Sequence, residues 1–338
     1  MYLSELTALS GVSGNEGAVR NFIKERITPL CDRIEIDNMG NLLAFKKGRG
    51  DSGKLLLLSA HMDEVGLIAG RITDEGFIKF KTVGSLDPRV LISKRVLVGQ
   101  EQIPGVIGRR AIHLLSAEER KQMPKISDLY VDIGVKNKKE AEKKVKVGDY
   151  ISFDSAYREF GAGLIKAKAL DDRAGCNVLM NLMREDCEWD VCFAFTVQEE
   201  VGLRGARILC KRQRPDVAVV VEGTTCSDLP ETAENMISTR LSKGAALSYI
   251  DAATCYNRPL VNFIYNLAKE QGVPVQIKQT ATGGNDAGAL HVSGGGIPTA
   301  VVSVPARYIH SPASVISKAD LNAVEALVKL IIQEVHHA

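Results

Sequence analysis

Seven acidic and imidazole residues of this 338-residue chain could bind divalent metals and carry out hydrolysis. Carboxylate oxygens and imidazole nitrogens suit zinc, cobalt or manganese. One catalytic zinc takes about three protein ligands, whereas five ligands with a shared carboxylate can hold two ions about 3.5–4 Å apart. The residues are His61, Asp63, Asp171, Glu199, Glu200, Glu222 and His310. The set is therefore large enough for one metal ion or for two.

These residues share their placement relative to predicted strands. Six of them follow the end of an apolar run, and Asp171 precedes a helix whose first turn it would help to cap. Ligands of an open α/β sheet bind outside the carboxyl ends of its strands, so we expect these side chains to converge on one rim. The apolar runs are 55–59 before His61 and Asp63, 191–197 before Glu199 and Glu200, 217–221 before Glu222, and 299–304 before His310.

Each motif also has a simpler interpretation. A histidine after a strand is often a hydrogen-bonded structural residue, and paired acids such as Glu199 and Glu200 are often solvated. Asp171 and Asp172 could only cap a helix, and Asp172 could form a surface ion pair with Arg173. One motif alone is weak evidence. Their shared position at strand ends favours a common site.

The elements that must position these residues predict an α/β fold. Long apolar strands alternate with helices, which indicates a mixed, mostly parallel sheet covered by helices. Between them, short alternating runs separated by Gly, Pro and Asp predict an inserted small β-barrel domain. We therefore expect a discontinuous α/β domain over 1–66 and 162–338, and a β domain over 67–161. The predicted helices span about 13–30, 172–184, 259–270 and 319–335, the first with a capping box at Ser13 and Glu16.

The charge balance excludes some classes of function. The chain has 43 basic and 41 acidic residues, a net charge of +2, which argues against a nucleic-acid binder. The basic segment 136–146 is interpreted as a solvated helix face. No apolar run approaches the roughly 20 residues of a membrane span, and the N-terminus does not resemble a signal peptide. Seven scattered cysteines, among them Cys192 and Cys210, fit reduced buried thiols in the cytoplasm.

Five ordered motifs carry a family resemblance that covers nearly the whole chain. The chain resembles the dinuclear metallo-aminopeptidases of the tetrahedral type, which include glutamyl and deblocking aminopeptidases and some enzymes formerly labelled endoglucanases. The resemblance implies a zinc-exopeptidase-like fold. The motifs are His-Met-Asp-Glu-Val-Gly at 61–66, Leu-Asp-Asp-Arg at 170–173, Gln-Glu-Glu-Val-Gly at 198–202, Glu-Gly-Thr-Thr at 222–225 and Arg-Tyr-Ile-His-Ser at 307–311.

The resemblance implies a role for each residue of the set. Two divalent ions, zinc or cobalt before manganese, would be held by five ligands, and Glu199 would act as general acid and base on a metal-activated water. Asp63 would orient the imidazole of His61 through its other ring nitrogen. The implied ligands are His61 and Glu222 for one metal, Glu200 and His310 for the other, and Asp171 as the bridge. Many family members carry Asp where this chain has Glu222.

The resulting prediction is a cytoplasmic aminopeptidase that removes N-terminal residues from short peptides. By resemblance, the β insert mediates assembly into dimers and a hollow twelve-subunit tetrahedron. The glycine-rich stretches 283–288 and 294–296 are a substrate-pocket wall or an ordinary loop. Three alternatives remain open: a glycoside hydrolase that uses Glu199 and Glu222, an N-acyl amino acid deacylase, and a non-catalytic scaffold.

Overall fold

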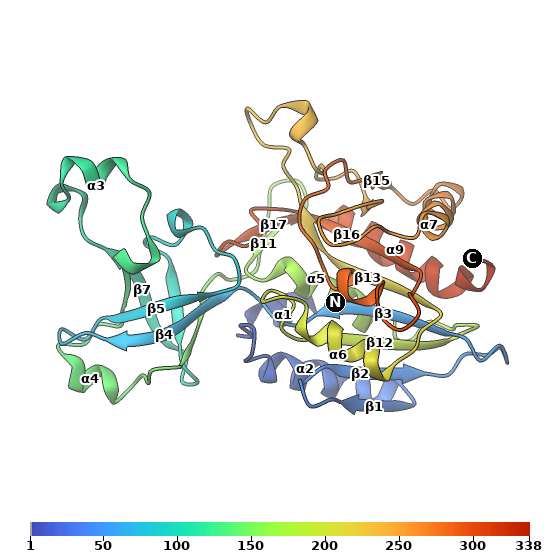
Figure 1. Ribbon diagram of the computed structural model, residues 1–338, viewed down its shortest axis with the longest axis horizontal. Coiled ribbons are helices and arrows are strands. Elements are labelled where there is room, and N and C mark those ends of the chain that lie inside the picture. Colours follow the sequence, from blue (N-terminus) through green and yellow to red (C-terminus); the bar gives the residue numbers. More distant parts are fainter. Residues whose placement is uncertain (1) are drawn as a thin grey trace.

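The computed structural model describes residues 2–338, except for the side chains of 210–212, so the expectation for Cys210 lies outside the described residues. A small barrel and a larger layered α/β body are the main parts of the fold (Figure 1). The barrel strands come from the middle of the chain, and the chain before and after them builds the other body.

Four parallel strands form the centre of an 11-stranded sheet. They are buried along almost their whole length because both faces of the sheet are covered, which explains their continuous apolar sequences. Parallel pairing brings the carboxyl ends of neighbouring strands to the same edge. In spatial order the four are β12 (Asp190–Thr196), β3 (Leu55–His61), β13 (Val217–Thr225) and β16 (Thr299–Arg307).

Antiparallel strands flank this centre on both sides. The sheet is therefore mixed, as predicted, with its parallel pairing concentrated where the candidate site residues lie. On one side are β2 (Leu42–Lys46) and β1 (Arg33–Ile36), and on the other β17 (Ser314–Ser317), β11 (Leu164–Ala167) and β10 (Arg158–Phe160). Beside β16 lie β14 (Ala245–Leu247) and β15 (Val275–Ile277).

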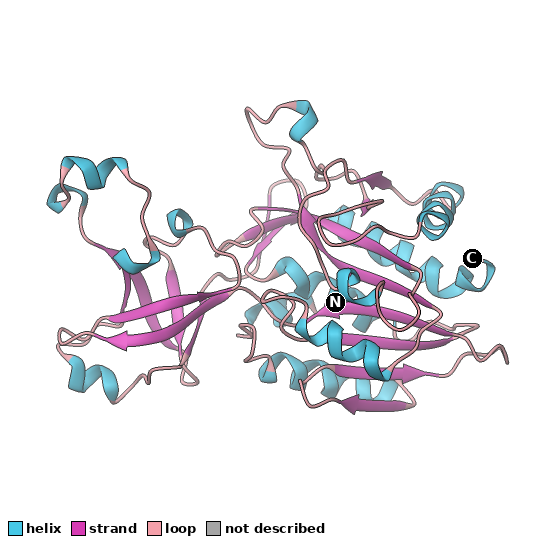
Figure 2. Ribbon diagram, in the orientation of Figure 1, coloured by secondary structure: helices cyan, strands magenta, loops and turns pink. Residues whose placement is uncertain are grey.

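Helices cover both faces of the sheet (Figure 2). The long helices α5 (Leu170–Leu182) and α9 (Lys318–Glu334) pack against the central strands and against each other. The sequence-based prediction missed α6, whose first residues are Arg and Gly rather than a helical apolar pattern. The other helices are α1 (Leu3–Ala8), α2 (Gly17–Ile27), α6 (Arg204–Arg212), α7 (Arg258–Glu270) and α8 (Ala287–Leu290). Short 3-10 helices span Thr28–Leu30, Pro88–Val90, Ile112–Leu114, Ile126–Asp128, Glu234–Met236 and Val335–His337.

The capping box predicted for the first long helix is wrong. Helix α2 begins at Gly17 after Glu16, and no side chain caps it. The Ser13 hydroxyl lies four residues before the helix and donates instead to the carboxylate of Asp63, 2.6 Å away. A long-range partner therefore replaces the local one that the sequence pattern suggested.

Six antiparallel strands close into a barrel, which confirms the predicted β-barrel. Alternating side chains of these strands form a second hydrophobic core, separate from that of the sheet. The strands are β4 (Gly66–Ile72), β5 (Ile78–Val83), β6 (Arg95–Val98), β7 (Ile103–Arg109), β8 (Leu129–Asp132) and β9 (Tyr150–Phe153), and the helices α3 (Ala117–Lys121) and α4 (Lys138–Glu142) lie in its connections. The domain boundaries proposed from the sequence stay predictions.

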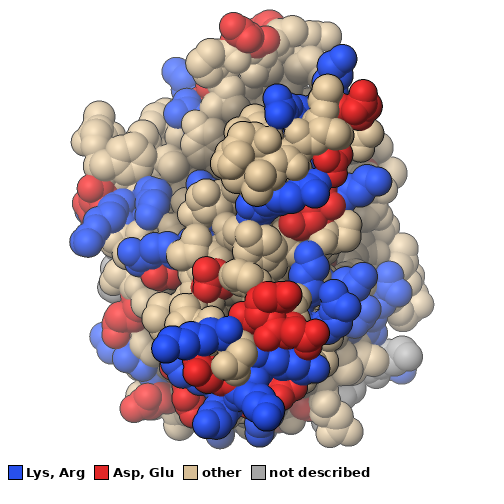
Figure 3. All heavy atoms as spheres, turned by 90° about the vertical axis from the view of Figure 1, so that its left-hand side faces the viewer, with Lys and Arg blue, Asp and Glu red and all other residues tan. Residues whose placement is uncertain are grey.

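Charges of both signs are interspersed on the barrel side of the molecule (Figure 3). The basic segment 136–146 contains the short helix α4, and its six lysines from Lys136 to Lys146 are exposed, as expected for a solvated face. Among residues 2–338, none of the helices is both long enough and apolar enough to cross a membrane.

Candidate active site

The ends of adjacent parallel strands bring the first site residues together. His61 is the last residue of β3 and lies opposite Thr196, the last residue of β12. The turn after β12 carries Glu199 and Glu200. Glu222 lies inside β13, because this strand continues to Thr225 and does not end before Glu222 as predicted.

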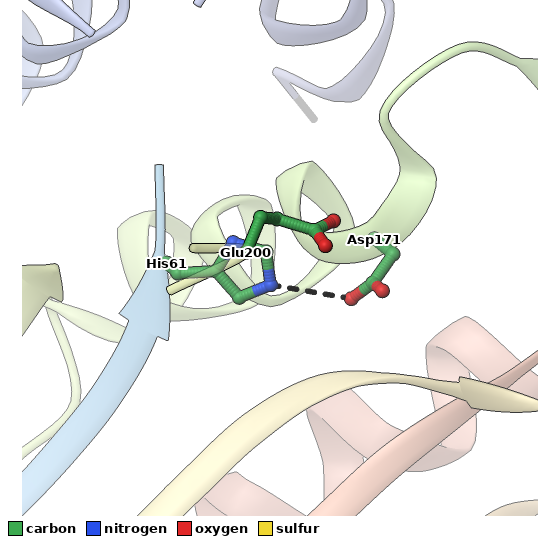
Figure 4. Close-up of side chains that lie close together, drawn as sticks. All are labelled: His61, Asp171 and Glu200. Carbon is green, nitrogen blue, oxygen red and sulfur yellow. Dashed lines mark ion pairs between the residues drawn. The ribbon is translucent and has the colours of Figure 1, made fainter. Parts of the chain in front are cut away.

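Asp171 lies between two imidazoles. Its Oδ1 is 3.3 Å from Nε2 of His61, and its Oδ2 is 3.7 Å from Nε2 of His310. The same His310 nitrogen is 3.2 Å from Oε2 of Glu200. Figure 4 shows His61, Asp171 and Glu200 pointing toward one another, and ligand atoms of these three residues all lie within 4.8 Å of each other. The geometry thus brings the carboxylates of Asp171 and Glu200 together with the imidazoles of two histidines, His61 and His310.

Glu199 and Glu222 border this group. Oε2 of Glu199 is 3.9 Å from Nε2 of His61, so its carboxylate faces the same imidazole as Asp171. Glu222 is 8% exposed, and the negative charges of Asp171 and Glu199 act on it. All seven residues selected from the sequence therefore belong to one region of the structure.

Asp63 contacts His61 mainly through its backbone. Nδ1 of His61 is 3.1 Å from the carbonyl oxygen of Asp63 and 3.6 Å from its carboxylate. The carboxylate instead accepts hydrogen bonds from the backbone N–H groups of Glu199 (3.0 Å) and Glu200 (3.2 Å) and from the hydroxyl of Ser13 (2.6 Å). Asp63 thus connects the end of β3 to the turn that carries both glutamates.

The expectation that Asp171 caps a helix is wrong, and Asp172 has that role. Both aspartates have non-helical backbone angles, so the regular part of α5 begins after them. The carboxylate of Asp172 accepts the N–H of Gly175 at 2.8 Å and the N–H of His61 at 3.2 Å. The side chain of Asp171 is thereby left to face the imidazoles.

Gly223 makes room for Asp171. A Cβ atom at this position of β13 would lie 3.0 Å from both Cβ and Oδ1 of Asp171, tighter than nearly all real Cβ contacts. A glycine inside a strand commonly marks such a close approach. The glycine after Glu222 in the fourth motif therefore has a steric reason.

Burial and mutual repulsion shift the proton affinity of the acids. Burial raises the pKa of Glu199 to about 8, and the charges of Asp286, Asp171 and Asp63 add to this effect. Burial, followed by the charge of Asp171, raises the pKa of Glu200 well above its ordinary value. The pKa of Glu222 is raised in the same way. A divalent cation would offset the repulsion that these carboxylates experience.

The environment favours the charged form of the His61 imidazole, whereas it favours the neutral form of these acids. Burial alone would lower the pKa of His61, but the nearby carboxylates of Asp171 and Asp63 raise it well above the ordinary value. The pKa of Asp63 is lowered, because its interactions with His61, Ser13 and the N–H of Glu199 outweigh the effect of burial. Oxygen and imidazole donors that are crowded together and stabilised by positive charge fit a divalent metal centre.

A buried ionic network lies behind the site, and the sequence-based analysis missed it. The carboxylate of Glu64 accepts from Nζ of Lys168 at 2.7 Å and from Arg173 at 3.3 Å. All three side chains are at most 3% exposed. Arg173 also donates to the carbonyl oxygens of Met62 (2.8 Å) and Leu6 (2.5 Å). The surface ion pair suggested for Asp172 and Arg173 is therefore wrong, because Arg173 is buried with Glu64.

Asp286 is a further buried acid near the site. It lies in the glycine-rich stretch 283–288, and its Oδ2 accepts the hydroxyl of Thr196 at 2.5 Å. Its Oδ1 is buried with no hydrogen-bond partner among the described residues. Burial raises the pKa of Asp286 to about 6. Asp286 had no role in the sequence-based interpretation, and its only signal was its place in that stretch.

Comparison with known proteins supports the same interpretation. The family model of M42 glutamyl aminopeptidases matches residues 40–327. A putative aminopeptidase from Acetivibrio thermocellus is 36% identical over 332 residues, which is 97% of each chain. A glutamyl aminopeptidase from Lactococcus lactis is 32% identical over 97% of this chain and 94% of its own. A lysyl aminopeptidase from Pyrococcus furiosus is 28% identical over 96% and 94%.

Solved structures share the whole fold. A TET aminopeptidase from a marine sediment archaeon of the Thaumarchaeota superposes with a TM-score of 0.94 at 35% identity, covering 98% of this chain and 94% of its own. The TET1 peptidase of Pyrococcus horikoshii gives 0.88 at 34%, with 98% of each chain covered. A Thermotoga maritima protein called an endoglucanase gives 0.83 at 39%, with 99% and 97% covered.

The fold, the acid and imidazole cluster and these matches define a peptide hydrolase. The chain belongs to the M42 glutamyl aminopeptidase family. The family resemblance carried by the five sequence motifs is thereby confirmed, including its association with proteins called endoglucanases.

Proposed function

We propose that this protein is a dinuclear metallo-aminopeptidase that removes N-terminal residues from short peptides. The observation that carries the proposal is the orientation of Asp171, whose two carboxylate oxygens face different imidazoles. A carboxylate that bridges two ions needs this arrangement. Family membership supports the peptide bond as the target.

The residues divide naturally between two metal positions. His61 and Glu222 would hold one ion, His310 and Glu200 would hold the other, and Asp171 would bridge them. The 3.2 Å distance between Nε2 of His310 and Oε2 of Glu200 supports the second group. When bound, the metals would polarise the scissile carbonyl and make an attacking water more acidic. Zinc and cobalt suit this donor set best, and manganese is a further candidate.

Glu199 would move the proton during hydrolysis. Its carboxylate would take a proton from the attacking water and pass it to the leaving amine, as a general acid and base. The position of Oε2, 3.9 Å from Nε2 of His61, supports this role because it lies at the edge of the ligand group. Asp63 would keep Glu199 in place through the hydrogen bond that it accepts from the Glu199 backbone.

Assembly and location are part of the same proposal. The P. horikoshii TET1 peptidase assembles into a tetrahedron or a large octahedral shell. We propose that this chain also forms a homo-oligomer, a twelve-subunit tetrahedron, through the β domain at 67–161, with the α/β domain at 1–66 and 162–338 carrying the active site. The cytoplasmic location expected from the sequence remains a prediction.

Metal reconstitution tests the function. Protein stripped with a chelator is reloaded with zinc, cobalt or manganese and assayed on a panel of aminoacyl amides. We expect activity to be lost on chelation, to return with a divalent metal and to require a free α-amino group. Activity that survives chelation would favour glycoside-type chemistry with Glu199 and Glu222. Cleavage restricted to N-acyl substrates would indicate a deacylase, and a fully loaded but inactive protein would indicate a scaffold.

A further inference from the structure

His310 is the most exposed of the proposed metal ligands. The side chain of His310 is 38% exposed, whereas those of His61 and Glu200 are 3% exposed and that of Asp171 is 13% exposed. We therefore expect a substrate to approach past His310. What lies outside this residue determines which peptides reach the centre.

A cavity of about 570 Å³ begins at His310. The loop after β16 forms one wall with His310 itself. The other side is lined by Lys94 just before β6, Arg95 at the start of β6, Asp154 just after β9 and Lys166 of β11. The cavity thus extends from His310 to the place where the barrel meets the edge of the central sheet, a junction visible in Figure 1.

The carboxylates that line this cavity are already neutralised. Asp154 forms an ion pair with the guanidinium of Arg95. Asp87 forms an ion pair with Arg89 and also accepts the backbone N–H of Arg89 at 2.9 Å. Neither acid leaves an uncompensated negative charge in the cavity.

The two lysines that line the cavity are not neutralised. The side chain of Lys94 is exposed, and its Nζ has no ion-pair or hydrogen-bond partner among residues 2–338. Nζ of Lys166 donates to the carbonyl oxygen of Ala156 at 3.1 Å, but no carboxylate in the described part of the chain pairs with it. The cavity therefore carries a net positive charge beside the route to the metal centre.

We propose that this cavity binds the part of the peptide beyond the scissile bond, and that Lys94 and Lys166 attract a carboxylate carried there. The inference rests on the proposed function: if the free N-terminus reaches the metal centre, the remainder of the peptide extends outward past His310. Val90 and Pro312 add apolar surface for the peptide chain. The attracted group is the C-terminal carboxylate of a short peptide or an acidic side chain. The substrate class is thus short peptides that are anionic on the leaving-group side.

Matched peptides test this selectivity. Peptides of two to five residues, all with the same N-terminal residue, are prepared as C-terminal acids and as C-terminal amides. At low salt we expect kcat/KM of the wild-type protein to favour the acid by about threefold to fivefold for at least one length, a size typical of exposed ion pairs. The preference should shrink in high salt because salt screens exposed charges. A second series compares C-terminal amides whose last residue is Asp with those whose last residue is Asn. A preference for Asp in this series shows attraction of a side-chain carboxylate, since the terminal carboxylate is absent.

Variants identify the lysines as the cause. Lys94→Ala and Lys166→Ala should each move the acid-to-amide ratio toward one, and Lys94→Glu should favour the amide. Lys139→Ala removes the same charge from the exposed face of α4, outside the cavity, and should leave the ratio unchanged. Equal rates for charged and neutral peptides in both series, or a ratio that the cavity variants do not change, would overturn the inference while hydrolysis itself persists. Loss of all peptide hydrolysis in the metal-loaded wild type would reject the proposed function as well.

Discussion

The carboxylate of Asp63 accepts a hydrogen bond from the backbone N–H of Glu199 at 3.0 Å, which joins the end of β3 to the turn after β12. The same carboxylate accepts from Glu200 and from the hydroxyl of Ser13. The role first expected for Asp63, orienting His61, is thus only one part of its contacts. Asp63 aligns three side chains of the candidate active site at once.

Removal of the Asp63 carboxylate should therefore disturb the site more than removal of one of its donors. Asp63→Ala leaves two backbone N–H groups without their acceptor, and we expect a loss of about 10- to 100-fold in metal affinity or activity. Ser13→Ala deletes one donor and should reduce the free energy of unfolding by only about 0.5–1.5 kcal/mol. Metal titration and hydrolysis rates measure the effect of Asp63→Ala, and denaturant unfolding measures that of Ser13→Ala. Wild-type metal affinity and rate in Asp63→Ala would contradict this view of the site.

Glu199→Gln should separate catalysis from metal binding. The amide keeps the shape of the side chain but cannot accept the proton, so we expect kcat to fall by about 10²- to 10⁴-fold. Metal content and melting temperature should stay close to those of the wild type. Glu101→Gln, an exposed acid of the barrel, is the matched control and should keep full activity. A Glu199→Gln protein that hydrolyses aminoacyl amides at the wild-type rate would disprove the assignment of the base.

The buried network around Glu64 should contribute strongly to stability. Glu64→Gln leaves the charges of Lys168 and Arg173 buried without a carboxylate, which costs about 3–5 kcal/mol in comparable cases. Glu5→Gln breaks the partly exposed ion pair with Arg26 and should cost less than about 1 kcal/mol. Denaturant midpoints of the two variants provide the comparison. Equal midpoints would show that the Glu64 network does not stabilise the fold.

The metal-free protein should become less stable as the pH rises from about 4.5 to about 8. The pKa of Glu199 rises from its ordinary value of 4.5 to about 8 in the folded state, so the folded state binds more protons than the unfolded state over this range. The raised pKa of His61 acts in the same direction, because its stabilising charge is lost as the pH rises.

Thermal melting of chelator-treated protein at several pH values measures this effect. We expect the melting temperature to fall across the range and the gain from added metal to be larger at pH 8 than at pH 5, because metal binding displaces protons from its ligands. A melting temperature that rises with pH in the metal-free protein would contradict the shifted pKa values.

The strand ends were the informative part of the sequence. Apolar runs before His61 and Glu199 predicted buried parallel strands, and the register of β3 with β12 brings the ends of these strands together. Local sequence patterns predicted hydrogen bonds less well where a residue distant in sequence competes for the same side chain. The sequence Ser13-x-x-Glu16 has the spacing of a capping box, yet Ser13 hydrogen-bonds to Asp63, which is 50 residues away.

The residue types, their order and their position after apolar strands were readable from the chain alone, because side-chain chemistry and strand periodicity are local properties. The spacing of the ligand atoms, the burial of Arg173 with Glu64 and the cavity outside His310 depend on contacts between segments more than 100 residues apart. Burial and charge proximity are properties of the packed chain. They arise when β3, α5 and the loop after β16 meet at one edge of the sheet.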